Sequence, residues 1–186
     1  MPCEVRLHPA TPAQLDRLDV GAIVLPMFAV RAQPRHVSGV VDWRMNGWLA
    51  TLLRERRFQG EAHEAVLTTT AGWLRTRRLF LFGLGRPAAL KEPHVAHRLR
   101  QAVEALRDAA AFEVAVGPPT APGFLCESES DMDVDFAERW FEAMAPDSQR
   151  FARLMLLDGA GRLAEHREQL ARAARARGLQ WKSPTH

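Results

Sequence analysis

Short apolar runs alternate with amphipathic stretches along nearly the whole chain, and this alternation constrains the fold more than any other feature. Strand-like runs occur at residues 3–7, 20–28, 65–69, 79–84, 112–116 and 151–157, with a short one at 179–181. Helix-like patterns occur at residues 38–57, 91–111, 133–145 and 162–177, after a short helical turn opened by Thr11-Pro12. Strands that alternate with helices predict a mixed, mostly parallel sheet covered on both faces. We therefore expect a three-layer α/β/α domain with about six strands and the N-terminal strand at an edge.

The stretch 38–57 carries a long helix pattern. Its apolar stripe consists of Val41, Met45, Trp48, Leu49, Leu52 and Leu53, whereas Arg44, Arg54 and Arg57 fall largely off it. Gly47 lies one helical turn from Trp43 and is expected to give that indole room. Gln59-Gly60 is expected to end the helix.

The composition is that of one ordinary globular domain spanning residues 1–186. Apolar residues make up 47% and charged residues 25%, which argues against disorder. The net charge of +3 is small for a nucleic-acid-binding protein. No signal-peptide core or membrane-length apolar stretch is present, and Cys3 and Cys126 form no CxxC pattern, so we expect a cytoplasmic protein with reduced thiols. Residues 118–131, with three prolines and two serines, are expected to form a long mobile loop.

Three stretches, in order, carry a family resemblance. The first is Asp19-Val-Gly-Ala-Ile-Val-Leu-Pro-Met-Phe28; the second runs from Gly39-Val-Val-Asp-Trp-Arg-Met-Asn-Gly-Trp-Leu49 to Phe58-Gln-Gly60 and Glu64; the third is Arg78-Leu-Phe-Leu-Phe-Gly-Leu-Gly85. Over roughly residues 15–117 the sequence resembles the N-terminal, non-catalytic domain of leucine aminopeptidases.

That resemblance implies a macro-domain-like fold, which commonly holds ADP-ribose or related nucleotides. In the full-length enzymes a second domain with two metal ions carries the peptidase chemistry, and no N-T-D-A-E-G-R-L-like segment occurs here. Metalloaminopeptidase activity is therefore not expected, nor is a bound metal or a cofactor. In macro domains a comparable strand leads to asparagines that contact the ligand, but here the stretch reads Leu25-Pro26-Met27. The resemblance therefore implies a ligand-contacting role for Asp19 at most.

Two glycine turns are candidate anion sites, because each lies between a predicted strand and a predicted helix. Gly83 and Gly85 are followed by Arg86, and Asp158 leads into Gly159 and Gly161. Ligands in open α/β sheets gather at the carboxyl ends of strands, where exposed N–H groups can bind a phosphate. If the two turns are neighbours, they would share one anion pocket. The alternative is that both are plain tight turns.

Metal-binding patterns are weaker. Asp131, Asp133, Asp135 and Glu142 match calcium-loop positions, but Phe136 stands where glycine is required. These acids are better interpreted as charges that favour a helix N-terminus. His94 and His97 are one helical turn apart but have no third ligand, and an exposed polar face explains them better.

These features lead to three functional hypotheses. The first is a non-catalytic binding or interaction module that takes a small anionic or nucleotide-like ligand at the strand ends, or a protein partner. The second is a hydrolase of ADP-ribosyl or phosphate esters, for which Asp19, Asp42 and Asp158 are the available acids. The third is an adaptor for nucleic acid or an acidic protein, which would use the basic residues Arg167, Arg172, Arg175, Arg177 and Lys182. Self-association stays open, and no membrane contact is expected.

Overall fold

The computed structural model describes residues 2–29, 33–86, 92–119, 129–159 and 161–182. Most of the predicted loop 118–131 and the second cysteine, Cys126, lie outside the described residues. The helix predicted to begin at Asp133 already begins at Glu129, so Asp131 belongs to the helix and not to a loop.

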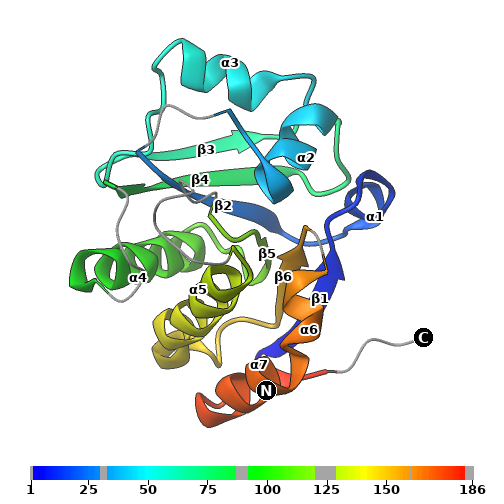
Figure 1. The fold of residues 1–186 in the computed structure, drawn as a ribbon, viewed down its shortest axis with the longest axis vertical. Helices are drawn as coiled ribbons and strands as arrows, with labels where there is room; N and C mark the ends of the chain where they lie inside the picture. The colour runs from blue at the N-terminus through cyan, green and yellow to red at the C-terminus, as the bar shows by residue number, and fades with distance from the viewer. Residues whose placement is uncertain (1, 30–32, 87–91, 120–128, 160, 183–186) are drawn as a thin grey trace.

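A seven-stranded sheet forms the centre of the domain, in the order β3-β4-β2-β5-β6-β1-β7 (Figure 1). The strands are β1 (Glu4–Pro9), β2 (Ala22–Phe28), β3 (Ala65–Thr69), β4 (Arg78–Gly85), β5 (Glu113–Val116), β6 (Arg153–Asp158) and β7 (Gln180–Trp181). All neighbours are parallel except β3, which is antiparallel to β4. The mixed, mostly parallel sheet is as predicted.

The prediction that the N-terminal strand forms an edge is wrong, because β1 lies between β6 and β7. Hydrogen bonds hold β7 along β1. The amide of Gln180 in β7 donates to the Cys3 carbonyl at 2.8 Å, and the amide of Lys182, the next residue after β7, donates to the Val5 carbonyl at 2.9 Å. This short closing strand also accounts for the seventh strand, where about six were expected.

Helices cover both faces of the sheet, which confirms the three-layer arrangement (Figure 1). One face carries α1 (Pro12–Arg17), α2 (His36–Arg44) and α3 (Trp48–Arg54). The other carries α4 (Pro93–Asp108), α5 (Glu129–Met144), α6 (Arg162–Glu165) and α7 (Arg167–Ala176), with a 3-10 turn at Ala145–Asp147. No helix among the described residues is both long enough and apolar enough to cross a bilayer.

The continuous apolar run of β2 follows from burial on both of its faces. Successive side chains of a strand point to opposite faces. Val24 therefore packs in the core beneath α4–α7, whereas Ile23 and Leu25 pack in the core beneath α1–α3. The whole strand is buried, as are most residues of β4.

The helix predicted over 38–57 is in fact two helices, because the chain turns at Asn46 and Gly47. Both residues have a left-handed backbone, with φ of 54° and 75°. The Asn46 amide donates to the Trp43 carbonyl and the Gly47 amide to the Asp42 carbonyl, which is the Schellman pattern that ends a helix. The Asp42 carboxylate then accepts a hydrogen bond from the Ala50 amide at 2.9 Å and caps the next helix.

The prediction that Gly47 gives the Trp43 indole room is wrong. Its side chain is 66% exposed, and a Cβ added at Gly47 would meet no atom within 4 Å. The predicted apolar stripe nevertheless holds across the break, because Val41, Met45 and Leu49 are buried against the same face of the sheet.

Candidate functional site

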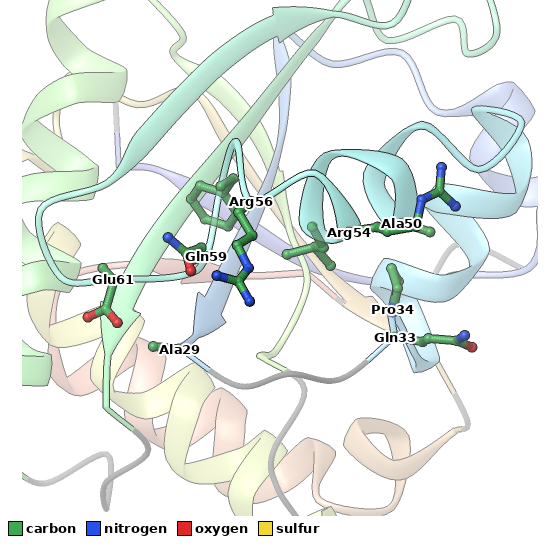
Figure 2. A pocket seen from close by; sticks show the side chains of 10 residues that line it. Ala29, Gln33, Pro34, Ala50, Arg54, Arg56, Gln59 and Glu61 are labelled. Atoms are coloured by element: carbon green, nitrogen blue, oxygen red, sulfur yellow. The ribbon is translucent and has the colours of Figure 1, made fainter.

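A pocket of about 650 Å³ opens at the carboxyl end of β2, on the face covered by α1–α3. It is lined by Ala29, Gln33, Pro34, Ala50, Leu53, Arg54, Arg56, Phe58, Gln59 and Glu61 (Figure 2). These residues come from the end of β2, the approach to α2, the helix α3 and the segment that follows α3. We refer to this hollow as the β2 pocket.

Arg56 reaches the β2 pocket from a Schellman turn at the end of α3. The Arg56 amide donates to the Leu53 carbonyl at 3.2 Å, and the Arg57 amide donates to the Leu52 carbonyl at 3.1 Å. The turn places Arg56 in the left-handed region with φ of 56°. Glycine is favoured at this position, because a side chain there costs about 1–2 kcal/mol. A strained arginine at the rim of a pocket therefore suggests a function for its side chain.

The far wall of the pocket is the segment 58–61, which is fixed by its neighbours. Phe58 is fully buried, and the Glu64 carboxylate accepts hydrogen bonds from the Gln59 amide at 2.7 Å and the Glu61 amide at 3.0 Å. Gly60 has φ of 79°, and a Cβ there would lie 2.5 Å from the Phe28 carbonyl oxygen. The wall is thus pinned to the end of β2.

The polar groups around the β2 pocket can recognise an anion. Arg54 and Arg56 are exposed arginines, and Gln33 and Gln59 add two side-chain amides. Figure 2 shows the side chains of Arg56 and Gln59 lying near each other on the same side of the pocket. No hydrogen bond or ion pair within the described residues engages the guanidinium of Arg56. Glu61 is the only acidic side chain in the described lining.

The predicted glycine turn at the end of β4 is closed. The Gly83 amide donates to the Glu64 carbonyl at 3.0 Å, and the Gly85 amide donates to the Gly60 carbonyl at 2.8 Å. A Cβ at Gly83 would lie 1.9 Å from the Glu61 carbonyl oxygen. These glycines let the pocket wall approach β4, and their N–H groups are used internally.

Two charged groups flank this turn. Arg98 of α4 donates to the Gly83 carbonyl at 3.1 Å and to the Glu64 carbonyl at 3.3 Å, and burial lowers the pKa of Arg98. Arg86, predicted to assist anion binding, follows Gly85 and is exposed.

The second predicted turn lies at the carboxyl end of β6. Asp158 is buried, and its carboxylate accepts a hydrogen bond from the Ala164 amide at 3.1 Å. A Cβ at Gly159 would lie 3.2 Å from a methyl group of Val37 in α2, whereas Gly161 is exposed with φ of 75°. The strands β2 and β5 lie between this turn and the turn at Gly83–Gly85, so the two turns are not neighbours.

Asp19 lies at the amino end of β2, opposite the end at which the β2 pocket opens. Its carboxylate forms an ion pair with Arg75 at 2.7 Å. Both residues line a smaller hollow of about 390 Å³, together with Val20, Gly21, Arg77 and Arg78. The guanidinium of Arg78 there donates to the carbonyls of Gly21 and Ala109. The sheet therefore separates Asp19 from the other predicted site residues.

The remaining candidates are dispersed. Burial, followed by the nearby charge of Glu4, raises the pKa of the Cys3 thiol to about 12, so it stays protonated and unreactive at neutral pH. On α7, Arg167, Arg172 and Arg175 are exposed, whereas Arg177, just after this helix, pairs with Glu142.

The sequence predicted a site at the carboxyl ends of the strands, where the β2 pocket also opens, but it did not identify the pocket residues. Arg54, Arg56, Gln59 and Glu61 lie in or just after a stretch that reads as one continuous amphipathic helix. The available signal was Phe58-Gln-Gly60 followed by Glu64, the step that carries part of the resemblance. It marks the pocket wall, but it does not reveal that the preceding turn aims Arg56 at the pocket.

A sequence comparison decides the family. The pattern of the "Cytosol aminopeptidase family, N-terminal domain" matches residues 24–127, which is more than half of the chain. The chain belongs to this family. The matched segment includes every described residue that lines the β2 pocket. No curated protein matches the sequence significantly.

Solved structures confirm the fold that the resemblance implied. A mutant of tomato leucine aminopeptidase superposes with a TM-score of 0.60 at 16% identity, covering 95% of this chain and 36% of that one. The macro domain of ganglioside induced differentiation associated protein 2 superposes with a TM-score of 0.61 at 13% identity, covering 91% of this chain and 84% of that one. An Oceanobacillus iheyensis macrodomain mutant "with ADPR" superposes with a TM-score of 0.57 at 12% identity, covering 82% of this chain and 86% of that one. The chain thus spans about a third of the tomato enzyme and most of a macrodomain.

Proposed function

We propose that this aminopeptidase-family domain is a non-catalytic binding module that holds a small anionic, nucleotide-like ligand in the β2 pocket. The observation that carries the proposal is Arg56, a strained arginine at the rim of the β2 pocket whose guanidinium has no partner among the described residues. A turn that needed only to end α3 would be better served by glycine.

The size and chemistry of the pocket suit such a ligand. Small-molecule sites enclose about 300–1,000 Å³ and combine apolar walls with a few polar groups, which a pocket of about 650 Å³ matches. Leu53 and Pro34, which are partly exposed, supply apolar surface for a ring. Arg54 and Arg56 supply charge for a phosphate, which guanidinium groups bind in a bidentate manner.

The position of the pocket adds support. Ligands of open α/β sheets bind beyond the carboxyl ends of strands where successive connections diverge. From β2 the chain passes to β4 on one side, and β5 lies on the other side of β2. Macrodomains of the same fold include the O. iheyensis structure with ADPR and a Trypanosoma brucei macrodomain "in complex with ADP".

The positions of the three candidate acids, Asp19, Asp42 and Asp158, favour a binding role over hydrolysis. The carboxylates of Asp42 and Asp158 each accept a backbone amide, and Asp19 is paired with Arg75. None of these three residues lines the β2 pocket. The hydrolase hypothesis therefore lacks a general base among the residues proposed for it.

Calorimetric titration with ADP-ribose, ADP and inorganic phosphate tests the proposal. We expect binding of the nucleotides and a matching rise in melting temperature, because a ligand of the native state stabilises it by mass action. Arg56→Ala should weaken binding about tenfold, since a charge-assisted hydrogen bond contributes about 1.5–3 kcal/mol. Arg57→Ala is the matched control, because Arg57 is the next arginine in the chain but does not line the pocket.

A second variant, Glu61→Gln, tests whether the charge of the pocket lining controls anion binding. Removing the acidic group from the lining should tighten anion binding a few-fold, by relief of like-charge repulsion. The absence of heat and of thermal stabilisation at millimolar nucleotide would refute the proposal. Equal losses in Arg56→Ala and Arg57→Ala would mean that the ligand binds elsewhere.

A further inference from the structure

The strand β3 forms an edge of the sheet, and one row of its backbone groups has no partner strand among the described residues. In the described chain β3 pairs with β4 alone. The Gly83 amide donates to the Glu64 carbonyl and the Thr70 amide donates to the Arg77 carbonyl, so the even-numbered residues between them bond to β4. The amides and carbonyls of Ala65, Leu67 and Thr69 consequently point away from the sheet.

This edge lacks the features that keep edge strands apart. Natural edges carry charged side chains, prolines or bulges that block pairing with another strand. Residues 65–69 read Ala-Val-Leu-Thr-Thr, contain no charge or proline, and pair with β4 without a register shift. Leu67 at the centre is 55% exposed, and Trp73 in the following hairpin is 51% exposed. Two of the four large apolar side chains exposed in the described structure therefore lie along one edge.

We infer that β3 is the contact strand of a symmetric dimer, in which a second copy of this chain pairs antiparallel with it about Leu67. Each Leu67 then faces its counterpart, and Ala65 faces Thr69 of the other copy. Because Leu67 directs its amide and carbonyl outward, the two copies exchange both hydrogen bonds at this pair. A two-fold interface needs a self-complementary surface, and an antiparallel strand pair supplies one.

The charges around β3 favour a second copy over an unrelated strand. Glu61 and Glu64 precede the strand, whereas Arg75 and Arg77 follow it in the hairpin. The Glu64 carboxylate accepts the Gln59 and Glu61 amides, and Arg75 pairs with Asp19, so Glu61 and Arg77 are the charges that act between the two copies. Antiparallel pairing brings the acidic start of one strand toward the basic end of the other, at both ends of the ladder. A parallel arrangement would place like charges together, so the charge order selects the antiparallel dimer.

Analytical ultracentrifugation of the full chain over a concentration series tests the inference. We expect a shift from the monomer mass of 20.8 kDa toward twice that value as concentration rises. Leu67→Lys should weaken dimerisation at least about tenfold, because it places two like charges opposite each other on the edge. Trp43→Lys is the matched control, since it changes an equally exposed apolar residue on α2 and should leave the dimer intact. Unchanged far-ultraviolet circular dichroism shows that Leu67→Lys folds.

Disulfide trapping tests the register. In a Cys126→Ser background, Leu67→Cys should cross-link to itself under mild oxidation, because the Cα atoms of a hydrogen-bonded antiparallel pair lie about 5.5 Å apart, within disulfide range. Ala65→Cys and Thr69→Cys should cross-link when mixed, and each alone should cross-link far less. A monomer at every concentration, or a dimer that Leu67→Lys does not weaken, would overturn the inference. A dimer that fails to trap at Leu67 would overturn the register.

Discussion

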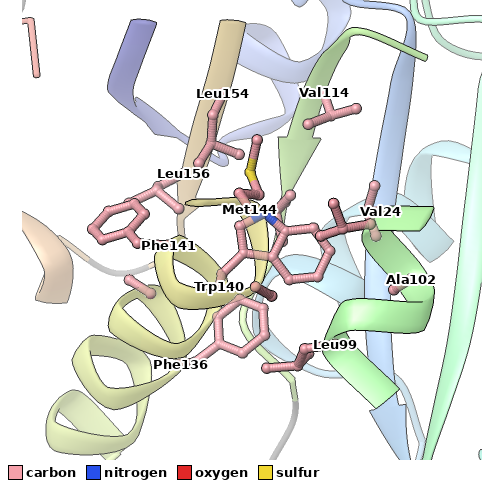
Figure 3. Packing of buried hydrophobic residues seen from close by; sticks show 14 of the residues in the cluster. Val24, Leu99, Ala102, Val114, Phe136, Trp140, Phe141, Met144, Leu154 and Leu156 are labelled. Atoms are coloured by element: carbon pink, nitrogen blue, oxygen red, sulfur yellow. The ribbon is translucent and has the colours of Figure 1, made fainter. Parts of the chain in front are cut away.

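The two helical layers of this domain differ in the length of their helices and in how tightly they cover the sheet. On one face α4 and α5 have 16 residues each, and they enclose a core that includes Phe136, Trp140 and Phe141 (Figure 3). On the other face α1, α2 and α3 have 6, 9 and 7 residues, and Phe58 is the only aromatic side chain of the described buried cluster there. The β2 pocket opens on this second face.

The difference indicates a division of labour between the layers. Long helices bury a continuous stripe and leave fewer unsatisfied backbone groups per residue, because each helix has the same number of such groups at its ends. Short helices joined by tight turns bring helix ends, loops and arginines close to the sheet. We infer that the α4–α7 layer stabilises the fold and that the α1–α3 layer carries the site.

The largest predicted effect concerns Trp140 at the centre of the α4–α7 layer. Its side chain is fully buried and lies 5.9 Å from the Phe136 ring, centroid to centroid. Trp140→Ala should lower the free energy of unfolding by about 3–5 kcal/mol in urea denaturation, because it leaves a large cavity. Trp43→Ala, at an exposed tryptophan, should change it by less than about 0.5 kcal/mol. Similar losses for the two variants would contradict the assigned packing.

A matched pair of leucines compares the layers directly. Leu99 of α4 and Leu49 of α3 are both fully buried. We expect Leu99→Ala to cost about 4 kcal/mol and Leu49→Ala about 2–3 kcal/mol, because short helices can move into the space and reduce the cavity. Urea unfolding of both variants measures the difference. Equal costs would show that the layers are equally rigid, and the division of labour would then fail.

Arg56→Gly separates stability from function within the α1–α3 layer. Glycine removes the left-handed strain, so the variant should gain about 0.5–1 kcal/mol, seen by calorimetry as a melting temperature raised by a few degrees. Nucleotide binding should fall as in Arg56→Ala.

Ala110→Gly is the control for this substitution in the other layer. Ala110 occupies the same Schellman position after α4, with φ of 52°. Its replacement should stabilise the domain by a similar amount and leave binding unchanged. A destabilised Arg56→Gly would show instead that the Arg56 side chain supports the fold.

The smallest expected effect concerns Glu142, which links α5 to α7. Burial raises the pKa of Glu142, but hydrogen bonds from Arg177 and Arg139 outweigh burial and hold the pKa below its usual 4.5. A lowered pKa in the folded state gives stability that is complete above pH 4.5 and is lost as the pH falls through the folded value. Glu142→Gln should therefore cost up to about 1 kcal/mol at pH 7, because the pair is partly exposed.

Urea titrations at several pH values between 3 and 7 test this pH dependence. The difference between Glu142→Gln and the unmodified chain should shrink below pH 4.5. Glu104→Gln, at an exposed residue of α4, is the control and should show no such trend. A constant difference across this range would mean that the ion pairs contribute nothing.

The positions of the strands were largely predictable, because burial on one or both faces leaves a direct mark on the sequence. Residues 65–69 form β3 as predicted, and the buried runs at 20–28 and 79–84 form the adjacent strands β2 and β4. Helix ends were less predictable. In the Schellman turns after α2, α3 and α4, the first left-handed residue is Asn46, Arg56 and Ala110, respectively, whereas after α7 it is a glycine, Gly178.

The sequence by itself determined the family and the α/β architecture, and it predicted a ligand at the carboxyl ends of the strands. Periodicity and local motifs, on which these inferences rest, are properties of neighbouring residues. The tertiary structure decided which groups meet at these strand ends. It showed that Gly83 and Gly85 use their N–H groups to hold a pocket wall, that Asp19 lies at the amino end of β2, and that Arg56 faces the pocket. These outcomes depend on strand order and on contacts between distant segments, such as Gly85 with Gly60, which no local pattern encodes.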